Sequence, residues 1–162
     1  MIDISTLSQS EKAWTLLNYA VGNYFGTGIN HEKQKFEAHC MISIEIPEKL
    51  LGIKFQAKGI QGEIYHDEIS WLGRDVSGSL ILYVNSTNHK GITPHYLNRI
   101  EESPRSPRKI VFRFGETEDK LSFREEITFA VHTNYNIEHS CAWGLPGGRF
   151  ETRSTSILKK IN

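Results

Sequence analysis

Hydrophobic and polar residues alternate along most of the chain from residue 22 onward. In the clearest run, Phe36 to Ile46, every second residue is apolar or small, and the residues between them are mostly polar. A period of two is that of a β-strand with one buried face. The full set of predicted strands covers residues 22–28, 36–46, 53–58, 63–72, 79–85, 93–100, 110–114, 121–131, 135–143 and 149–159.

One segment before these strands has helical periodicity. Ser8 and Glu11 have the spacing of a capping box, in which each side chain bonds a free backbone N–H of the other. Trp14, Leu17 and Val21 follow at positions i, i+3 and i+7. A short helix is therefore predicted over about residues 8–20, before a first strand that carries Gly22, Gly26 and Gly28.

The connections between the predicted strands are mostly short, which indicates antiparallel neighbours joined in chain order. A meander of about ten strands leaves two exposed edges unless it closes on itself. The sequence therefore predicts an all-β fold: an antiparallel up-and-down barrel of about ten strands with one short N-terminal helix. At 162 residues, one domain over 1–162 is expected.

The last strands allow the register to be predicted. A three-residue turn at Thr133 to Tyr135 would place Phe129 opposite His139 and Glu125 opposite Trp143. Since Glu125 shares a face with Phe123 and Ile127, both polar side chains would then face the barrel interior. A buried carboxylate is costly unless it is paired, protonated or hydrated. Glu125 and His139 thus form either a polar contact for a ligand, an acid/base pair, or an internal hydrogen bond without further function.

Composition excludes some partner classes. Nineteen basic and nineteen acidic residues cancel, which argues against a nucleic-acid partner. No apolar run approaches the roughly 20 residues that a membrane span needs. The first residues lack the features of a signal peptide, so a cytoplasmic location is expected. Cys40 and Cys141 lie within apolar strands and are expected to be free buried thiols.

The helix, the glycine-containing first strand and the ten-strand meander resemble the calycin-like (lipocalin-like) barrels, among them the fatty-acid-binding and nitrobindin-like proteins. The segment from Gly22 to Gly28 is similar to the Gly-x-Trp-x-Gly-x-Gly start of nitrobindin-like barrels, with Tyr24 in place of Trp. The resemblance implies that the barrel interior binds a small ligand. Nitrobindins hold haem through a histidine close to the final strand, and residues 149–159 contain none. No cofactor is therefore expected, and His139 and His132 are the late-chain candidates if haem is bound.

The resemblance also points to Arg153, because fatty-acid-binding proteins hold a carboxylate with an interior arginine and tyrosine near the C-terminus. The alternative for Arg153 is an exposed charge ladder with Arg149 and Glu151 on the last strand. Trp143, at the end of its strand, can contact a ligand at the barrel mouth. The residues predicted to bind ligand are Tyr83, Glu125, His139, Trp143 and Arg153, with no metal site and no assigned catalytic residue.

His66 and Glu68 share one strand face, and a solvated strand face or a pocket rim is preferred for them over a metal site. The function predicted from the sequence is binding of a small, mainly apolar or amphipathic ligand inside the barrel. Alternatives are an isomerase or cyclase-type enzyme that uses His139 and Glu125, a haem protein, and a filled barrel that acts as an interaction module. The oligomeric state stays open, a homodimer included.

Overall fold

The computed structural model describes residues 3–103 and 107–161. They form one helix, α1 (Gln9–Tyr19), and ten strands. The strands are β1 (Gly22–Asn30), β2 (Lys35–Ile46), β3 (Leu50–Gly59), β4 (Ile64–Arg74), β5 (Leu80–Ser86), β6 (Thr93–Glu101), β7 (Arg108–Phe114), β8 (Arg124–Val131), β9 (Ile137–Gly144) and β10 (Glu151–Ile161).

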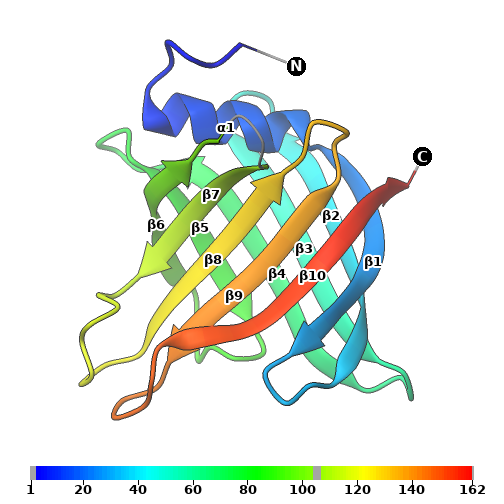
Figure 1. The fold of residues 1–162 in the computed structure, drawn as a ribbon. Helices are drawn as coiled ribbons and strands as arrows, with labels where there is room; N and C mark the ends of the chain where they lie inside the picture. Colours follow the sequence, from blue (N-terminus) through cyan, green and yellow to red (C-terminus); the bar gives the residue numbers. More distant parts are fainter. Residues whose placement is uncertain (1–2, 104–106, 162) are drawn as a thin grey trace.

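The strands form a closed antiparallel barrel in chain order. Each strand pairs with its neighbours in sequence, and β1 closes the barrel by pairing antiparallel with β10. Figure 1 shows β10 lying beside β1 across the front of the barrel. The predicted all-β, ten-strand barrel with one N-terminal helix is confirmed, because closure satisfies the strand edges that an open meander would expose.

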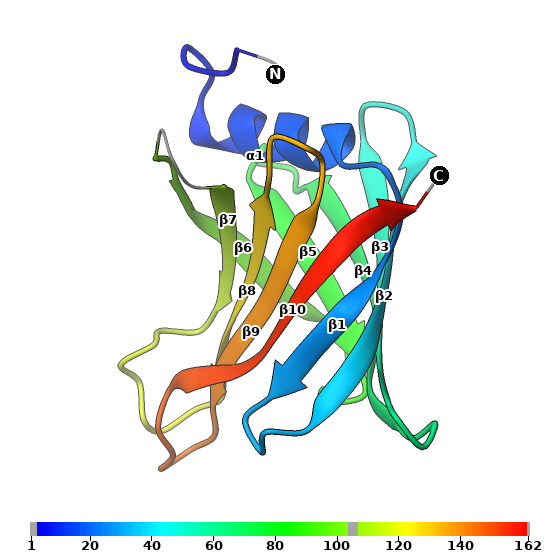
Figure 2. The same ribbon diagram turned by 45° about the vertical axis from the view of Figure 1, so that its right-hand side comes forward.

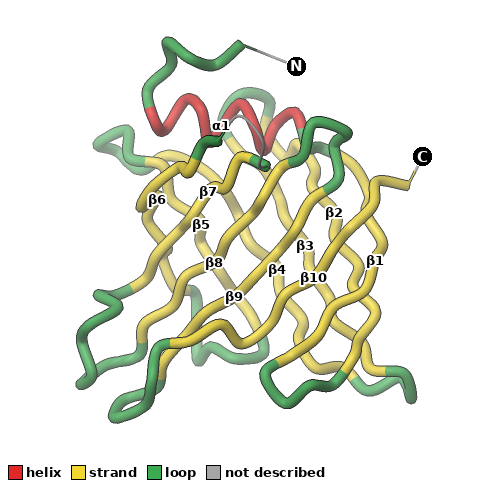
Figure 3. Tube along the Cα trace, viewed as in Figure 1, coloured by secondary structure: helices red, strands yellow, loops and turns green. Residues whose placement is uncertain are grey.

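Helix α1 lies across one end of the barrel, as Figures 2 and 3 show. The predicted capping box is present: Glu11 N donates to Ser8 Oγ at 3.3 Å, and Ser8 N donates to Glu11 Oε2 at 2.9 Å. The helix buries Ala13, Leu16 and Leu17 against the barrel. This end is called the helix end. No helix among the described residues has the length and hydropathy needed to cross a membrane.

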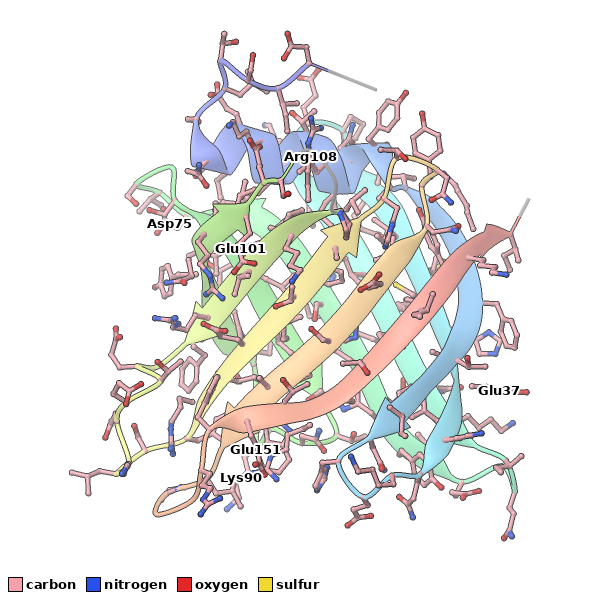
Figure 4. The ribbon with its side chains drawn as sticks, in the orientation of Figure 1. Glu37, Asp75, Lys90, Glu101, Arg108 and Glu151 are labelled. Carbon is pink, nitrogen blue, oxygen red and sulfur yellow. The ribbon has the colours of Figure 1, made fainter. Side chains whose placement is uncertain are left out.

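The opposite end of the barrel, called the loop end, is formed by the connections 31–34, 60–63, 87–92, 115–123 and 145–150. In Figure 4, Lys90 and Glu151 mark the loop end, and Asp75 and Arg108 mark the helix end.

The glycines of β1 permit a close approach of neighbouring chain segments. A Cβ atom added at Gly26 would lie 1.8 Å from the carbonyl oxygen of Ile157 in β10. One added at Gly28 would lie 2.2 Å from the ring of Phe36. The glycine-rich first strand is therefore required by the tight packing of β1 against β10 and β2.

Three predicted strands begin two or more residues too early. Residues 119–122 form a turn in which Asp119 accepts from the backbone of Leu121, so β8 begins at Arg124. Tyr135 has a positive φ of 66° in the turn before β9, which begins at Ile137. The last strand begins at Glu151.

The apolar core fills the helix end of the barrel interior. Leu51, Leu72, Leu80 and Ile137 are all at most 2% exposed there. Toward the loop end, side chains on the same inner wall become partly exposed, among them Phe114, Cys141 and Trp143. Phe114 ends β7 and Trp143 is the last but one residue of β9, so this exposed surface lies at the open loop end. An interior site that a ligand can reach would therefore lie in the half of the barrel away from α1.

Candidate functional site

A cluster of polar side chains lies on the inner wall of the barrel, toward the loop end. Strands β4, β6, β8 and β9 contribute to it, because every second side chain along a strand faces the same side of the sheet. The members of this interior polar cluster are His66, Glu68, Ser70, His89, His95, Glu125, His139 and Cys141. Glu68, Ser70, His95, Glu125 and His139 are each at most 4% exposed.

Glu125 is the centre of one half of the cluster. Its Oε2 atom lies 2.8 Å from His95 Nε2 and also 2.8 Å from His89 Nε2. The His95 contact has hydrogen-bond geometry, whereas the His89 ring is poorly aligned despite the short distance. Cys141 Sγ donates to the other carboxylate oxygen at 3.1 Å. This carboxylate is thus surrounded by donors from three different parts of the chain.

The electrostatics of Glu125 follow from these contacts. Burial acts to raise its pKa, but the short contacts and positive charge of His89 and His95 outweigh burial and hold the pKa of Glu125 well below its ordinary value. In the same way, burial acts to lower the pKa of His89, and the Glu125 carboxylate outweighs burial and raises it. Burial, and next the charge of Glu125, raise the pKa of the Cys141 thiol well above its ordinary value. Glu125 is therefore an ionised acceptor, and Cys141 a neutral donor.

Glu68 is the centre of the other half. Its Oε2 lies 3.1 Å from His66 Nε2, and its Oε1 accepts from Ser70 Oγ at 2.5 Å. His66 Nδ1 lies 3.0 Å from Asn88 Nδ2 in the β5–β6 connection. Burial acts to raise the pKa of Glu68, but His66 outweighs it, with smaller contributions from His139 and Ser70, and the net shift is downward. The pocket-rim alternative fits His66, and the solvated-face alternative is wrong for Glu68, which is 4% exposed.

His139 differs from His89 and His95, because no described carboxylate lies within ion-pair distance of its ring. Its Nε2 atom is buried and has no hydrogen-bond partner among the described residues. Its ring packs against Phe55 and Phe129, with centroids 4.2 and 5.2 Å away. Burial lowers the pKa of His139 to about 4, although the Glu68 carboxylate acts in the opposite direction. At neutral pH the ring is therefore uncharged, with one nitrogen as donor and the other as acceptor.

The predicted register of the last hairpin is confirmed. Phe129 pairs with His139, and Glu125 pairs with Trp143. Both polar residues face inward on buried strand faces. They do not form the predicted pair, however: no hydrogen bond joins Glu125 to His139 among the described contacts, and the histidine bonded to Glu125 is His95.

Trp143 and Arg153 lie together near the loop end. The Arg153 guanidinium carbon lies 4.2 Å from the centroid of the Trp143 ring, and Arg153 Nε donates to the Trp143 carbonyl at 3.2 Å. A bulge between Thr152 and Ser154 takes Arg153 out of the β10 ladder. As a result Thr152 pairs with Ala142 on the outer face, and Ser154 pairs with Cys141 on the inner face. Arg153 does form an ion pair with Glu151, at 2.9 Å, and its contact with Trp143 places it beside the barrel mouth.

Tyr83 lies on the outer wall. It pairs with Trp71 in β4 and Pro94 in β6, one position from the inward-facing Leu82 and His95. Its predicted place among the interior contacts is therefore wrong. The pattern in β5 does not indicate which face Tyr83 occupies, because Leu80, Ile81 and Leu82 are all apolar. Ile81 on the outer side is as buried as Leu80 and Leu82 on the inner side.

Sequence reasoning missed His89 and His95. His95 could have been placed by its position, since it shares a strand face with Thr93 and Leu97, but the strand pattern there is weak. His89 lies in the β5–β6 connection, where no periodicity exists to orient it. The contacts of both residues with Glu125 cross the barrel from β6 and its preceding loop to β8, so they depend on closure.

Two grooves on the described surface lie apart from this cluster. One, of about 710 Å³, is lined by residues of the β7–β8 and β9–β10 connections and by Arg99, Arg113 and Glu126. The other, of about 570 Å³, is lined by Ile29, Ile60 and Ile157 with parts of β1, β2 and β10. Neither is lined by any of the five residues predicted to bind ligand.

The cluster does not have the geometry of a metal or haem site. Among residues 3–103 and 107–161, no group of three or more His, Cys, Asp or Glu side chains could hold a metal ion. Haem ligation needs a histidine nitrogen facing space wide enough for a porphyrin, but Phe55 and Phe129 pack against His139. His132 Nε2 is bound to Glu138 at 2.8 Å. The two late-chain histidines therefore do not fit haem.

The closed ten-strand meander with a helix across one end has the fold of the calycin-like barrels, as the resemblance implied. Comparison with solved structures agrees: the crystal structure of Rv2717c from M. tuberculosis matches with a TM-score of 0.70 and 11% sequence identity, over 96% of this chain and 99% of that one. A redesigned β-barrel, mFAP1, bound to DFHBI, matches with a TM-score of 0.48 and 9% identity, over 90% and 98% of the two chains, which is too weak to support an argument. No protein-family model matches the sequence, and no curated protein has significant sequence similarity to it. At this identity the likeness establishes the fold alone.

Proposed function

We propose that this barrel binds a small, mainly apolar or amphipathic molecule in the loop-end half of its interior. The observation that carries the proposal is the interior polar cluster itself. It contains two carboxylates and four histidines, all buried or only partly exposed, inside a barrel whose other half is filled by aliphatic side chains.

Such a cluster is poorly explained by stability alone. Two ionised carboxylates held inside a barrel cost desolvation energy that their partners only partly recover, and well-packed apolar residues in their place are often neutral or stabilising. Polar groups in a core that could be apolar are most common at binding sites, where local rules of packing are broken for function. This supports a ligand-contacting role for the cluster.

The exposure gradient supports access from the loop end. Phe114, Cys141 and Trp143 face inward and are partly exposed, whereas the helix end is covered by α1 and filled. The apolar rings near the mouth would contact the body of a ligand, and the cluster would contact its polar group. That division is typical of ligand sites, which combine mainly apolar walls with a few placed polar groups.

The enzymatic alternative receives less support. Glu125 is held ionised by two histidines, with its pKa well below the ordinary value, so it is a weak base. It also has no direct contact with His139. We therefore propose binding, not proton transfer, as the activity.

Binding can be tested with an environment-sensitive apolar dye and with native mass spectrometry of freshly purified protein. The test variant Cys141→Leu adds side-chain volume to the inner wall and should weaken dye binding about tenfold or more. The control variant Tyr83→Leu changes the outer wall at a comparable position along the barrel and should leave dye affinity within about twofold. If the wild-type protein binds no dye and retains no small molecule, or if both variants behave alike, the proposal is wrong.

A further inference from the structure

Two buried side-chain nitrogens among the described residues have no hydrogen-bond partner, His89 Nε2 and His139 Nε2. His89 Nε2 nevertheless lies 2.8 Å from Glu125 Oε2, whereas no described carboxylate lies within ion-pair distance of His139. The Nε2 atom of His139 is therefore the less compensated of the two. It is buried without a hydrogen-bond partner among the described residues, and His139 as a whole is only 3% exposed. A buried polar atom left without a partner costs free energy that a suitable partner would recover. Aromatic rings of Phe55 and Phe129 pack against the same imidazole. His139 Nε2 is thus a polar atom on a ring that packs between two aromatic side chains.

The neighbouring polar groups have already found partners inside the protein. Ser70 Oγ donates to Glu68, Cys141 Sγ donates to Glu125, and Ser156 Oγ donates to the backbone carbonyl of His139. None of these contacts involves the His139 ring. The other unpartnered nitrogen, His89 Nε2, already lies against the Glu125 carboxylate, so a ligand gains a new hydrogen bond at His139 without displacing any of these contacts.

The charges around His139 disfavour an ionic ligand. Glu68 and Glu125 already pair with His66, His89 and His95, so a ligand carboxylate would find no free cationic partner on this wall. Each carboxylate is already matched by its own histidines, His66 for Glu68 and His89 with His95 for Glu125. A ligand cation would therefore find no unpaired acidic partner.

We infer that the ligand carries an uncharged hydroxyl group on a planar or aromatic apolar body, and that this hydroxyl hydrogen-bonds to Nε2 of His139. The inference rests on the proposed function and specifies its ligand class. A hydroxyl is both donor and acceptor, so it suits either tautomer of the neutral imidazole. It differs from the carboxylate recognition that the fatty-acid-binding resemblance implied through Arg153.

Access to His139 requires a local movement. Nε2 is covered in the structure, so a neighbouring side chain must turn aside before a hydroxyl can reach it. Phe55 is the closest aromatic ring, and its displacement would let the ligand's own ring take its place against the imidazole. The exchange replaces one aromatic contact by another and adds a hydrogen bond.

Three naphthalenes of nearly equal shape test the inference. 2-Naphthol and 2-methylnaphthalene are uncharged at pH 7, and 2-naphthoate is an anion. Their dissociation constants would be measured at pH 7 by quenching of tryptophan fluorescence and by calorimetry. Wild-type protein should bind 2-naphthol at least about fivefold more tightly than 2-methylnaphthalene, as one hydrogen bond supplies, and 2-naphthoate more weakly than either.

The variant His139→Phe keeps an aromatic ring and removes the nitrogen. It should bind 2-naphthol and 2-methylnaphthalene equally, with 2-methylnaphthalene within about twofold of wild type. His139→Gln restores an amide acceptor and should recover part of the preference. The control His132→Phe changes a histidine outside the cluster, bound to Glu138, and should keep the wild-type ratio. Long-range ¹H–¹⁵N spectra of the wild-type protein should show the His139 Nε2 resonance shifting with 2-naphthol and not with 2-methylnaphthalene.

The outcomes separate this inference from the proposed function. If the naphthalenes bind but 2-naphthol has no advantage, if 2-naphthoate binds most tightly, or if His139→Phe keeps the wild-type preference, the hydroxyl inference is overturned and binding stands. An unshifted Nε2 resonance overturns it independently of any variant's folding. If wild-type protein binds none of the three, the proposed function and the inference are both overturned.

Discussion

His95 and Glu125 are 30 residues apart in sequence and on strands separated by β7, yet His95 Nε2 lies 2.8 Å from Glu125 Oε2 inside the barrel. The same carboxylate oxygen is 2.8 Å from His89 Nε2. One carboxylate thus joins β8 to β6 and to the connection before it. This contact connects the stability of the barrel to the ionisation of its interior.

Replacing Glu125 by Gln should destabilise the protein by about 2 kcal/mol, because two buried histidines lose an ionised partner. The pKa of His89, raised in the native protein by Glu125, should fall in the variant. In the wild type, protonated His89 contributes to the free energy of unfolding below its unfolded pKa, and this contribution is lost as pH rises through its folded pKa. In Glu125→Gln this pH dependence of the free energy of unfolding should disappear. Chemical denaturation and NMR titration of His89 measure both effects.

Glu138 provides the matched control for this change. Its Oε1 also lies 2.8 Å from a histidine, His132, but its side chain is 45% exposed. Glu138→Gln should therefore change stability by no more than about 0.5 kcal/mol. Equal effects of the two substitutions would contradict the role assigned to burial.

His139 should make the protein sensitive to mild acid. Its folded pKa of about 4 lies below the ordinary 6.5, because burial disfavours the charged ring. The unfolded chain therefore binds the proton between these values and the native protein does not, so stability is present above pH 6.5 and is lost as pH falls toward 4. Between pH 7 and 4.5 the wild type should lose about 2 kcal/mol more than His139→Phe. Urea denaturation of both proteins at the two pH values measures the difference, and parallel curves would contradict a neutral buried His139.

The strands and the last hairpin register could be predicted because alternation of period two is strong in those segments. Glu125 and His139 were placed correctly since a one-residue slip would turn their apolar neighbours outward. The face of Tyr83 could not be predicted, because both sides of β5 are buried and its apolar run does not alternate. Arg153 left the predicted pattern through a bulge, which no periodicity marks.

The partners of Glu125 were beyond sequence reasoning for a different reason. His89 lies in a connection, and His95 meets Glu125 only because the closed barrel brings β6 and β8 to face a common interior. Pattern analysis orients side chains relative to their own sheet face. It does not specify which inward residues meet across the interior.

Gly26→Ala should destabilise the barrel by at least about 2 kcal/mol, because the new Cβ would lie 1.8 Å from the Ile157 carbonyl and force β1 away from β10. Gly91→Ala is the control: nothing lies within 4 Å of a Cβ at that position. Thermal unfolding should show a large loss for the first and almost none for the second. A small effect of Gly26→Ala would mean that β1 and β10 are less closely packed than described.

Cys40 and Cys141 should react slowly with a thiol reagent in the native protein and quickly in denaturant. Burial raises the pKa of Cys40 to about 12, and burial with the Glu125 charge raises that of Cys141, so little thiolate is present at pH 8. Comparing the wild type with Cys40→Ala and Cys141→Ala assigns the rates. Rapid native labelling of Cys141 would contradict its contact with Glu125.

Arg124 should stabilise the loop end by joining two of its connections, 115–123 and 145–150. The side chain is 1% exposed and donates to the carbonyl oxygens of Leu145 at 2.7 Å and Gly148 at 2.8 Å, and also to those of Thr117 and Ser122. Arg124→Ala should cost about 3 kcal/mol, since it removes a buried guanidinium and its hydrogen bonds to four backbone carbonyls. Arg149→Gln, an exposed change in the β9–β10 connection, should cost less than about 0.5 kcal/mol.

Gly144 gives a sharper test of Arg124. A Cβ at Gly144 would lie 2.7 Å from the guanidinium carbon of Arg124, so Gly144→Ala should destabilise the wild type by displacing the guanidinium from its carbonyl partners. In an Arg124→Ala background the obstacle and the contacts are both gone, and the same change should cost about 1 kcal/mol less than in the wild type. A double-mutant cycle measured by chemical denaturation gives this coupling. Additive effects of the two substitutions would mean that Gly144 is required for a reason other than the seating of Arg124.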